Sequence, residues 1–202
     1  MAIRKERGVI VPTDCFFQGC DNPIYEREIK KCKKVCEKYN RVPFSNAKKK
    51  ARILRRLLGG FGDGSTIVAP FWCDYGYHIF AGKRFYANHN FVVQDGATVT
   101  IGDDVFIGPD CVITTAEHAI DPAMRRAGIE IAKPVTIKNN VWLGAGVRVL
   151  AGVTIGENCV IGAGSVVTKD IPANTVAFGV PCRVYRSISE ADAHSRMKTS
   201  LN

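Results

Sequence analysis

The stretch that decides the fold is residues 135–167, VTIKNNVWLGAGVRVLAGVTIGENCVIGAGSVV. Apolar residues recur there in pairs every six residues, and glycine often follows the second member. The pairs are Val135/Ile137, Val141/Leu143, Val147/Val149, Val153/Ile155, Cys159/Ile161 and Ser165/Val167. A period of six matches neither an α-helix nor a simple amphipathic strand. It is typical of a parallel β-helix, in which each short strand is followed by a turn.

The six-residue pattern extends toward the N-terminus with one interruption. Val99/Ile101, Val105/Ile107 and Cys111/Ile113 precede a gap at residues 114–134. Weaker repeats with bulky aromatic residues begin near residue 61, and their phase slips by two residues before Val99. We expect these aromatic early coils to contact the segment that precedes them, and the last repeat to end near Ile171.

The chain has 202 residues, enough for one β-helix domain with an appendage. We divide it into a basic helical segment (1–60), a β-helix (61–188) and a polar tail (189–202) that is expected to fray. Helical spacing and start signals predict helices over 23–40 and 45–58, after an irregular stretch at 1–22. These helices have one apolar face to bury, and the β-helix is the available partner.

Targeting signals and membrane spans are not predicted. No apolar run approaches the roughly 20 residues that cross a bilayer, and the first residues do not resemble a secretory signal. We therefore expect a cytoplasmic protein without a membrane partner.

The net charge of +9 is concentrated at the N-terminus. Residues 1–60 hold 16 Lys and Arg against 6 Asp and Glu, a balance of +10, whereas residues 61–202 hold 12 against 13, a balance of −1. Such asymmetry can indicate an arm that binds nucleic acid or a membrane surface. The basic residues are mixed with Glu26, Glu28 and Glu37, and no aromatic stacking pattern accompanies them. We favour a solvated helical face and no nucleic-acid partner.

The eight cysteines are expected to be reduced thiols in a cytoplasmic protein. Cys111 and Cys159 occupy apolar positions of the repeat and are predicted to lie in the core. The pairs Cys15/Cys20 and Cys32/Cys36 are spaced loosely like zinc ligands, but no histidine accompanies them. We therefore expect no metal site.

His118 is the polar residue of greatest interest, because it lies in the long excursion from the repeat. Loops on a rigid scaffold commonly carry function, and a neutral histidine can take a proton from a hydroxyl. A lone histidine is nevertheless more often structural or simply exposed. A second polar set surrounds the weak repeats at Asp74, Tyr86, Asn88 and Asp95, where adjacent coils could bring Asn88 near the His118 loop. Asn and Asp also favour ordinary turns.

The C-terminal coils offer a third candidate region. Gly144–Gly146 and Gly162–Gly164 contain only small residues, so an extended ligand could approach closely, and the nearby cations suit phosphates. The alternative is ordinary turn residues with a solvated tail. Trp142 should face outward, where it could form the wall of a ligand site or a subunit contact.

Three segments together resemble one family. They are IKNNVWLGAGVRVLAGVTIGENCVIGAGSVVTKDIPANTVAFGVPCRV at 137–184, FYANHN at 85–90 and EHAIDPAMRRAGIE at 117–130. They resemble the maltose and galactoside O-acetyltransferases, a subgroup of the hexapeptide-repeat acyltransferases. The resemblance covers about residues 67–188 and extends more loosely into the N-terminal helices. It implies a left-handed parallel β-helix, a homotrimer with active sites between subunits, and acetyl-CoA as co-substrate without a metal.

The resemblance also implies roles for individual residues. His118 matches the general base, Glu130 a loop acid that orients it, and Asn88 a residue that stabilises the transition state or binds the acceptor. Backbone N–H groups near Ala145 would bind the oxyanion. The acceptor side comprises Asp74, Tyr86, Asn88 and Asp95. The coenzyme A groove comprises Trp142, Ala145, Ala163, Thr168, Lys169, Arg183 and Arg186, of which the last two and Lys169 would face its phosphates.

The departures from the family pattern fall on the acceptor side. Where the family usually has an acceptor-contacting Asp near the N-terminus, this chain offers Gln18, or Asp21 if the alignment slides, and Gly96 replaces a second carboxylate. The activity that the resemblance leads us to expect is acetyl transfer to a hydroxyl of a sugar or glycoside. The alternatives are the same chemistry on an antibiotic, an amino sugar or a biosynthetic intermediate, and a non-catalytic hexapeptide scaffold.

Overall fold

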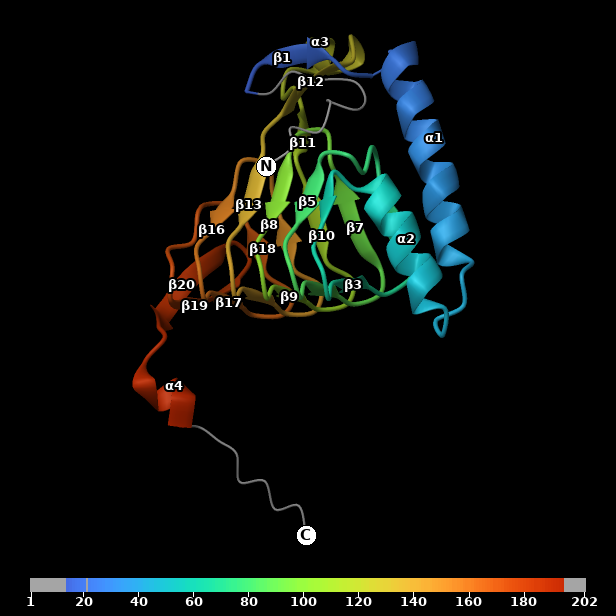
Figure 1. Ribbon diagram of the computed structural model, residues 1–202. Helices are drawn as coiled ribbons and strands as arrows, with labels where there is room; N and C mark the ends of the chain where they lie inside the picture. The colour runs from blue at the N-terminus through green and yellow to red at the C-terminus, as the bar shows by residue number, and fades with distance from the viewer. Residues whose placement is uncertain (1–13, 21, 195–202) are drawn as a thin grey trace, which may run out of the picture.

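The computed structural model describes residues 14–20 and 22–194. Within them the chain winds into a parallel β-helix, and two helices lie along one end of it (Figure 1). The predicted fold class is confirmed. No helix in this part of the chain is both long and apolar enough to cross a membrane.

Three sheets form the faces of the β-helix, and each of the first five coils contributes one short parallel strand to each sheet. Sheet 1 contains β2 (Gly60–Phe61), β5 (Ile79–Ala81), β8 (Val99–Ile101), β13 (Val135–Ile137) and β16 (Thr154–Ile155). Sheet 2 contains β3 (Thr66–Ile67), β6 (Tyr86–Ala87), β9 (Phe106–Ile107), β14 (Trp142–Leu143), β17 (Val160–Ile161), β19 (Thr175–Gly179) and β20 (Cys182–Ser187). Sheet 3 contains β4 (Phe71–Cys73), β7 (Phe91–Gln94), β10 (Val112–Thr114), β15 (Arg148–Val149) and β18 (Val166–Val167).

The predicted apolar positions line the inside of the coils. In sheet 1, Val99 pairs with Val135 and Ile101 with Ile137, and all four are buried. Cys111 and Cys159 are fully buried, as predicted. Among the residues that the structure describes, eight non-glycine residues adopt the left-handed conformation, most of them at turns between strands. Seven of the eight are Asn or Asp, the types that tolerate it best.

The early coils are longer than the later ones, which explains the phase slip. Phe71 pairs with Phe91 twenty residues later, whereas Arg148 pairs with Val166 eighteen residues later. The extra residues lie where the chain passes from sheet 3 to sheet 1, at 74–78 and 95–98.

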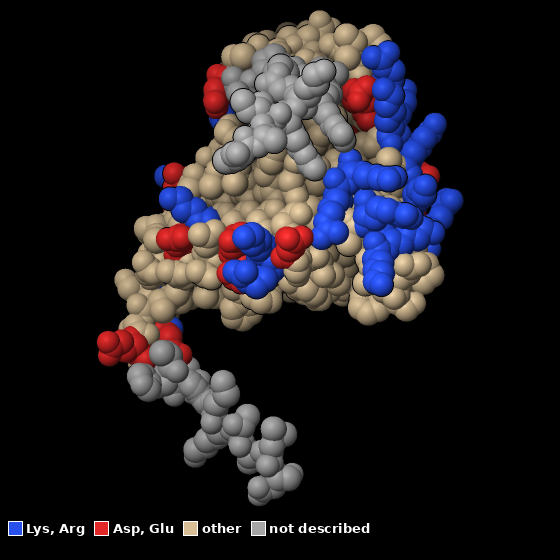
Figure 2. Space-filling view, in the orientation of Figure 1, with Lys and Arg blue, Asp and Glu red and all other residues tan. Residues whose placement is uncertain are grey.

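The N-terminal helices are α1 (Pro23–Asn40) and α2 (Ala47–Leu57), close to their predicted bounds. Asn22 and Asn46 cap their first turns. Tyr39 and Leu54 are buried in the same core as Phe71, so the aromatic early coils do contact these helices. The exposed faces of the helices carry the Lys and Arg side chains that form the basic surface in Figure 2. Some are neutralised locally, as in the Lys30–Glu26 pair at 2.9 Å.

The interruption at 114–134 is an ordered protrusion. It contains β11 (Ala116–His118), the short helix α3 (Pro122–Arg126) and β12 (Ile129–Ala132), with β11 antiparallel to β12. The expectation of an irregular stretch before residue 23 is wrong for β1 (Phe16–Gln18), which adds to the other edge of β12. Residues 16–18 are ordered as a strand by their pairing with β12, which the sequence of 16–18 alone does not indicate.

The C-terminal end of the β-helix closes differently. β20 turns back antiparallel onto β19, and α4 (Glu190–His194) follows. The predicted fraying therefore does not apply to 190–194, and residues 195–202 of the predicted tail lie outside the described residues.

Candidate active site

Two corners of the β-helix carry most of the candidate residues. The small-residue corner joins sheet 2 to sheet 3 and comprises residues 88–90, 108–110, 144–146 and 162–164. The hairpin corner joins sheet 3 to sheet 1 and comprises residues 74–78, 95–98, 115–134 and 168–170. They lie at opposite ends of the strands of sheet 3.

His118 projects from the end of β11 and is more than half exposed. Its partner in the ladder is Glu130 of β12, and His118 Nδ1 lies 3.6 Å from Glu130 Oε1. This is beyond ordinary hydrogen-bond length, but contacts of catalytic groups are often long before substrate binds. With Nδ1 facing the carboxylate, Nε2 is available to a substrate.

The N-terminal strand completes the surroundings of Glu130. Phe17 pairs with Glu130 across β1 and β12, and the Cys20 thiol donates to Glu130 Oε1 at 2.9 Å. A Cβ atom at Gly19 would overlap the Glu130 carboxylate, so only glycine permits this approach. Cys20, His118 and Glu130 form one of the two groups of side chains in the described chain close enough to share a metal ion.

Sequence reasoning missed this role of Gly19 and Cys20. Their contact with Glu130 spans 110 residues and depends on how β1 docks, which no local pattern reports. Gln18 is exposed at the end of β1, and Asp21 lies outside the described residues.

Asp95 is a buried organiser of the hairpin corner. Its carboxylate accepts the backbone N–H groups of Asp74 and Tyr75 at 2.9 Å and of Gly76 at 2.6 Å. Burial raises its pKa to about 7, although these three hydrogen bonds oppose the rise. Asp95 has no exposed surface in this chain, so direct contact with an acceptor would need the turn at 74–76 to move.

Asp74 is partly exposed and paired with Lys33 of α1, with 2.7 Å between Oδ1 and Nζ. Burial lowers the pKa of Lys33, but the Asp74 carboxylate more than offsets this, so that the pKa lies above its usual value. The carboxylate of the predicted acceptor residue Asp74 is therefore paired with the ammonium group of a lysine of α1.

Asn88 begins the small-residue corner, and its Oδ1 accepts the backbone N–H of His89 at 2.8 Å. Gly108, Gly144 and Gly162 occupy the matching position in successive coils. A Cβ atom at Gly108 would meet the backbone of Ala145, and one at Gly144 the backbone of Ala163. The small residues thus let neighbouring coils stack closely and leave Ala145 and Ala163 exposed.

The expectation that adjacent coils bring Asn88 near His118 is wrong within one chain. Val92 of β7 pairs with Val112 of β10 in parallel. Asn88 precedes the first of these strands and His118 follows the second, so they lie beyond opposite ends of sheet 3.

The predicted coenzyme residues divide in the same way. Ala145 and Ala163 lie at the small-residue corner. Arg183 of β20 pairs with Phe178 of β19, and Phe178 lies beside Gly162 of this corner. Thr168 and Lys169 lie exposed at the hairpin corner. Arg186 makes two 2.7 Å hydrogen bonds to Asp192 of α4.

The outer face of sheet 2 carries a row of exposed aromatic side chains. Tyr86, Phe106 and Trp142 are successive partners in register, and Phe106 and Trp142 are each more than half exposed. The outward direction predicted for Trp142 is confirmed. Exposed apolar rows of this kind mark contact surfaces on soluble proteins.

Comparison with known proteins agrees with this architecture. Three family models match: the maltose acetyltransferase hexapeptide capping motif at 20–62, the hexapeptide repeat of succinyl-transferase at 98–116, and the bacterial transferase hexapeptide at 134–169. Galactoside O-acetyltransferase of Escherichia coli is 42% identical over 82% of this chain and 82% of its own length.

Solved structures agree as well. The structure of a galactoside acetyltransferase in complex with coenzyme A superposes with a TM-score of 0.86 at 38% identity, over 91% of this chain and 92% of that one. A maltose O-acetyltransferase from Clostridium difficile superposes with a TM-score of 0.82 at 44% identity, over 84% and 90%. The chain therefore belongs to the hexapeptide-repeat acetyltransferases, in the maltose and galactoside O-acetyltransferase subgroup, and is an acetyl-CoA-dependent acetyltransferase.

Proposed function

We propose that this protein transfers the acetyl group of acetyl-CoA to a hydroxyl of a sugar or glycoside, in sites formed between the copies of a homotrimer. The observation that carries the proposal is the His118–Glu130 pair at an exposed strand end. It offers a base whose orientation is set by a carboxylate, as general-base catalysis requires.

In the proposed reaction, His118 Nε2 removes the proton of the acceptor hydroxyl as that oxygen attacks the thioester carbonyl carbon. The C–S bond then breaks, and coenzyme A leaves as a thiolate that takes the proton from the imidazolium. Glu130 holds the ring through Nδ1 and balances its transient charge. No covalent enzyme intermediate forms.

Backbone N–H groups of the small-residue corner stabilise the oxyanion. Gly144 and Gly146 donate to the carbonyls of Ile161 and Pro109. Ala145 lies between them, and its N–H donates to no acceptor within the described part of the chain. A preorganised donor of this kind is worth most where negative charge develops in the transition state.

The separation of the two corners supports a site between subunits. A base at the hairpin corner of one copy and Asn88 with the oxyanion donor at the small-residue corner of the next would complete the constellation. The aromatic row on sheet 2 offers an apolar surface for this association. Trp142 serves either this contact or the coenzyme groove that the next copy completes.

A second candidate keeps the chemistry and changes the acceptor. Asp74 is paired with Lys33, and Asp95 is fully buried. The acceptor side therefore offers fewer unpaired, exposed carboxylates than the sequence predicts. An acceptor other than a simple sugar, such as an antibiotic, an amino sugar or a biosynthetic intermediate, fits this arrangement.

The test measures release of free coenzyme A from acetyl-CoA across a panel of sugars, glycosides and amino-alcohol antibiotics. We expect acceptor-dependent release that falls by about 10²–10⁴-fold in His118→Ala, the usual contribution of a positioned general base. A loss below about tenfold would refute the assigned role of His118. Preference for a non-sugar acceptor would select the second candidate, and release without any acceptor would exclude both.

A further inference from the structure

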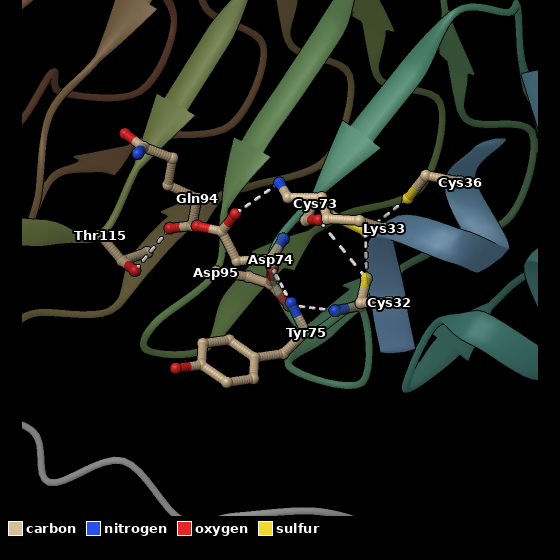
Figure 3. A network of polar contacts seen from close by, with 10 residues as sticks. Cys32, Lys33, Cys36, Cys73, Asp74, Tyr75, Gln94, Asp95 and Thr115 are labelled. Carbon is tan, nitrogen blue, oxygen red and sulfur yellow. Dashed lines mark hydrogen bonds and ion pairs between the residues drawn. The ribbon is translucent and has the colours of Figure 1, made fainter. Parts of the chain in front are cut away.

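Three buried cysteines meet where α1 docks on the first coil of the β-helix. Cys32 and Cys36 lie one turn apart on α1, and Cys73 ends β4 on the facing sheet. Figure 3 shows the three sulfur atoms converging between the helix and the strand. At most 4% of any of these side chains is exposed.

The distances between the sulfurs suit a shared metal ion. Cys32 Sγ lies 3.5 Å from Cys73 Sγ, Cys36 Sγ lies 3.8 Å from it, and all three fall within 4.8 Å of one another. A metal–thiolate bond is about 2.3 Å long, so three sulfurs around an ion in their plane lie about 4.0 Å apart. The Cys32–Cys73 distance needs to lengthen by about 0.5 Å and the Cys36–Cys73 distance by about 0.2 Å to reach this geometry.

The surroundings select the type of ion. No fourth His, Cys, Asp or Glu belongs to this group in the described chain, and burial keeps water away. Structural zinc sites prefer four ligands in a tetrahedron, whereas thiolates select soft ions such as Cu(I). Three sulfurs without a fourth ligand therefore favour a three-coordinate soft ion.

We propose that Cys32, Cys36 and Cys73 form a binding site for one thiophilic metal ion, with Cu(I) as the ion that fits best. Binding replaces the thiol protons, which pass to the solvent, with metal–sulfur bonds. The bound ion fastens α1 to β4 beside the Lys33–Asp74 pair. The site stands on its own geometry and does not depend on the proposed acetyl transfer.

The test starts from a Cys15→Ser/Cys20→Ser background, because those two thiols lie nearer the surface and would compete for the probe. The purified full-length protein is titrated anaerobically with Cu(I) against a chromophoric Cu(I) chelator, and X-ray absorption reports the ligands. We expect one Cu(I) per chain, bound by three sulfurs at about 2.3 Å. Because the ion binds the folded state, Tm should rise with Cu(I) concentration.

Variants identify which thiols bind. Cys36→Ala in this background should weaken Cu(I) binding by at least about a hundredfold, since it removes a direct ligand. Cys159→Ala is the matched control, because that thiol is equally buried but lies in a later coil, and its binding should equal that of the background.

Three results would overturn the proposal. The first is equal Cu(I) affinity in the Cys36→Ala and Cys159→Ala variants. The second is a spectrum of the background protein with fewer than three sulfur ligands, which decides the matter even where Cys36→Ala fails to fold. A fourth ligand with Zn²⁺ preferred over Cu(I) would likewise contradict the three-coordinate site.

Discussion

The small-residue corner and the hairpin corner occupy opposite ends of the same sheet, and they are built in opposite ways. The first has Asn88 in an early coil and glycine at the matching position of the next three coils, so that neighbouring coils stack closely. The second is enlarged by extra residues at 74–78 and 95–98 and by the protrusion that carries His118. In the proposed mechanism the first corner supplies backbone donors, and the second supplies the base.

This difference explains why one chain is not a complete catalyst in the proposed mechanism. The strands of sheet 3 hold the two corners apart, and no rotation of a side chain spans that separation. A β-helix is a rigid stack with a closed core, so motion within one copy cannot join them. Symmetric association of identical chains brings unlike surfaces together and closes the distance.

Glu130→Gln at the hairpin corner should have the largest effect among the variants considered next. Replacing the carboxylate removes a charged contact worth about 1.5–3 kcal/mol, so kcat should fall by about 10–100-fold while the KM for acetyl-CoA is unchanged. Steady-state kinetics with acetyl-CoA and the best acceptor give both values. Glu117→Gln is the matched control, because Glu117 lies on the same hairpin but pairs with Lys133. Equal kcat values for these two variants would refute the role of Glu130 in orienting His118.

Asp95→Asn tests the stability of the hairpin corner. The amide keeps one acceptor oxygen but places an N–H₂ group where Gly76 donates, which should cost about 1–3 kcal/mol of the free energy of unfolding. Denaturant unfolding of wild type and variant measures the difference.

The pH dependence of that difference has a definite sign. Burial raises the pKa of Asp95 to about 7 in the folded state, whereas an Asp carboxyl ordinarily has a pKa of 3.8. The folded state therefore binds the carboxyl proton of Asp95 more tightly than the unfolded state. The contribution of Asp95 to stability is therefore fully present below pH 3.8, the unfolded-state pKa, and is lost as the pH rises through about 7, the folded-state pKa. The advantage of wild type over Asp95→Asn should shrink between about pH 5 and about pH 7.5.

Asp103→Asn is the control for this titration, because Asp103 caps a turn at an exposed position and its Oδ1 acceptor survives the change. An equal change with pH in this variant would show that the change does not come from Asp95. An advantage over Asp95→Asn that grows with pH would mean that the three backbone N–H groups outweigh burial.

Arg183→Ala at the small-residue corner should have the smallest effect. Losing one exposed cation near the coenzyme phosphates should raise the KM for acetyl-CoA by about tenfold, with little change in the KM for the acceptor. Initial rates at varied concentrations of each substrate separate the two constants. A change confined to the acceptor KM would contradict the placement of the coenzyme along this corner.

Much of the fold could be predicted from the sequence, because each apolar pair of the repeat specifies one inward-facing strand. Val99 and Ile101 needed no tertiary information to be assigned to the core, and the stripe on residues 23–40 specified a helix. The strand at 16–18 could not be predicted in this way. It depends on an edge offered by residues 129–132, more than a hundred positions away.

The site was predictable only in its parts. His118 stood out because it lies in an excursion from a regular repeat, and the ladder then pairs it with Glu130. The relation of Asn88 to His118 was misjudged because spacing alone does not say which corner a turn occupies, and the longer early coils shift the count. The grouping of Cys73 with Cys32 and Cys36 was hidden for a similar reason, since it depends on how α1 docks.

The most direct test of the central claim is complementation between two inactive variants. Asn88→Ala and His118→Ala proteins are mixed in equal amounts, dissociated and reassembled, and subunit exchange is verified by mass. Each site should need His118 from one copy and Asn88 from its neighbour, so about a quarter of the sites in random trimers are intact. We expect the mixture to regain about a quarter of the wild-type rate. A mixture no more active than its parents, despite verified exchange, would contradict a site formed between copies of this chain.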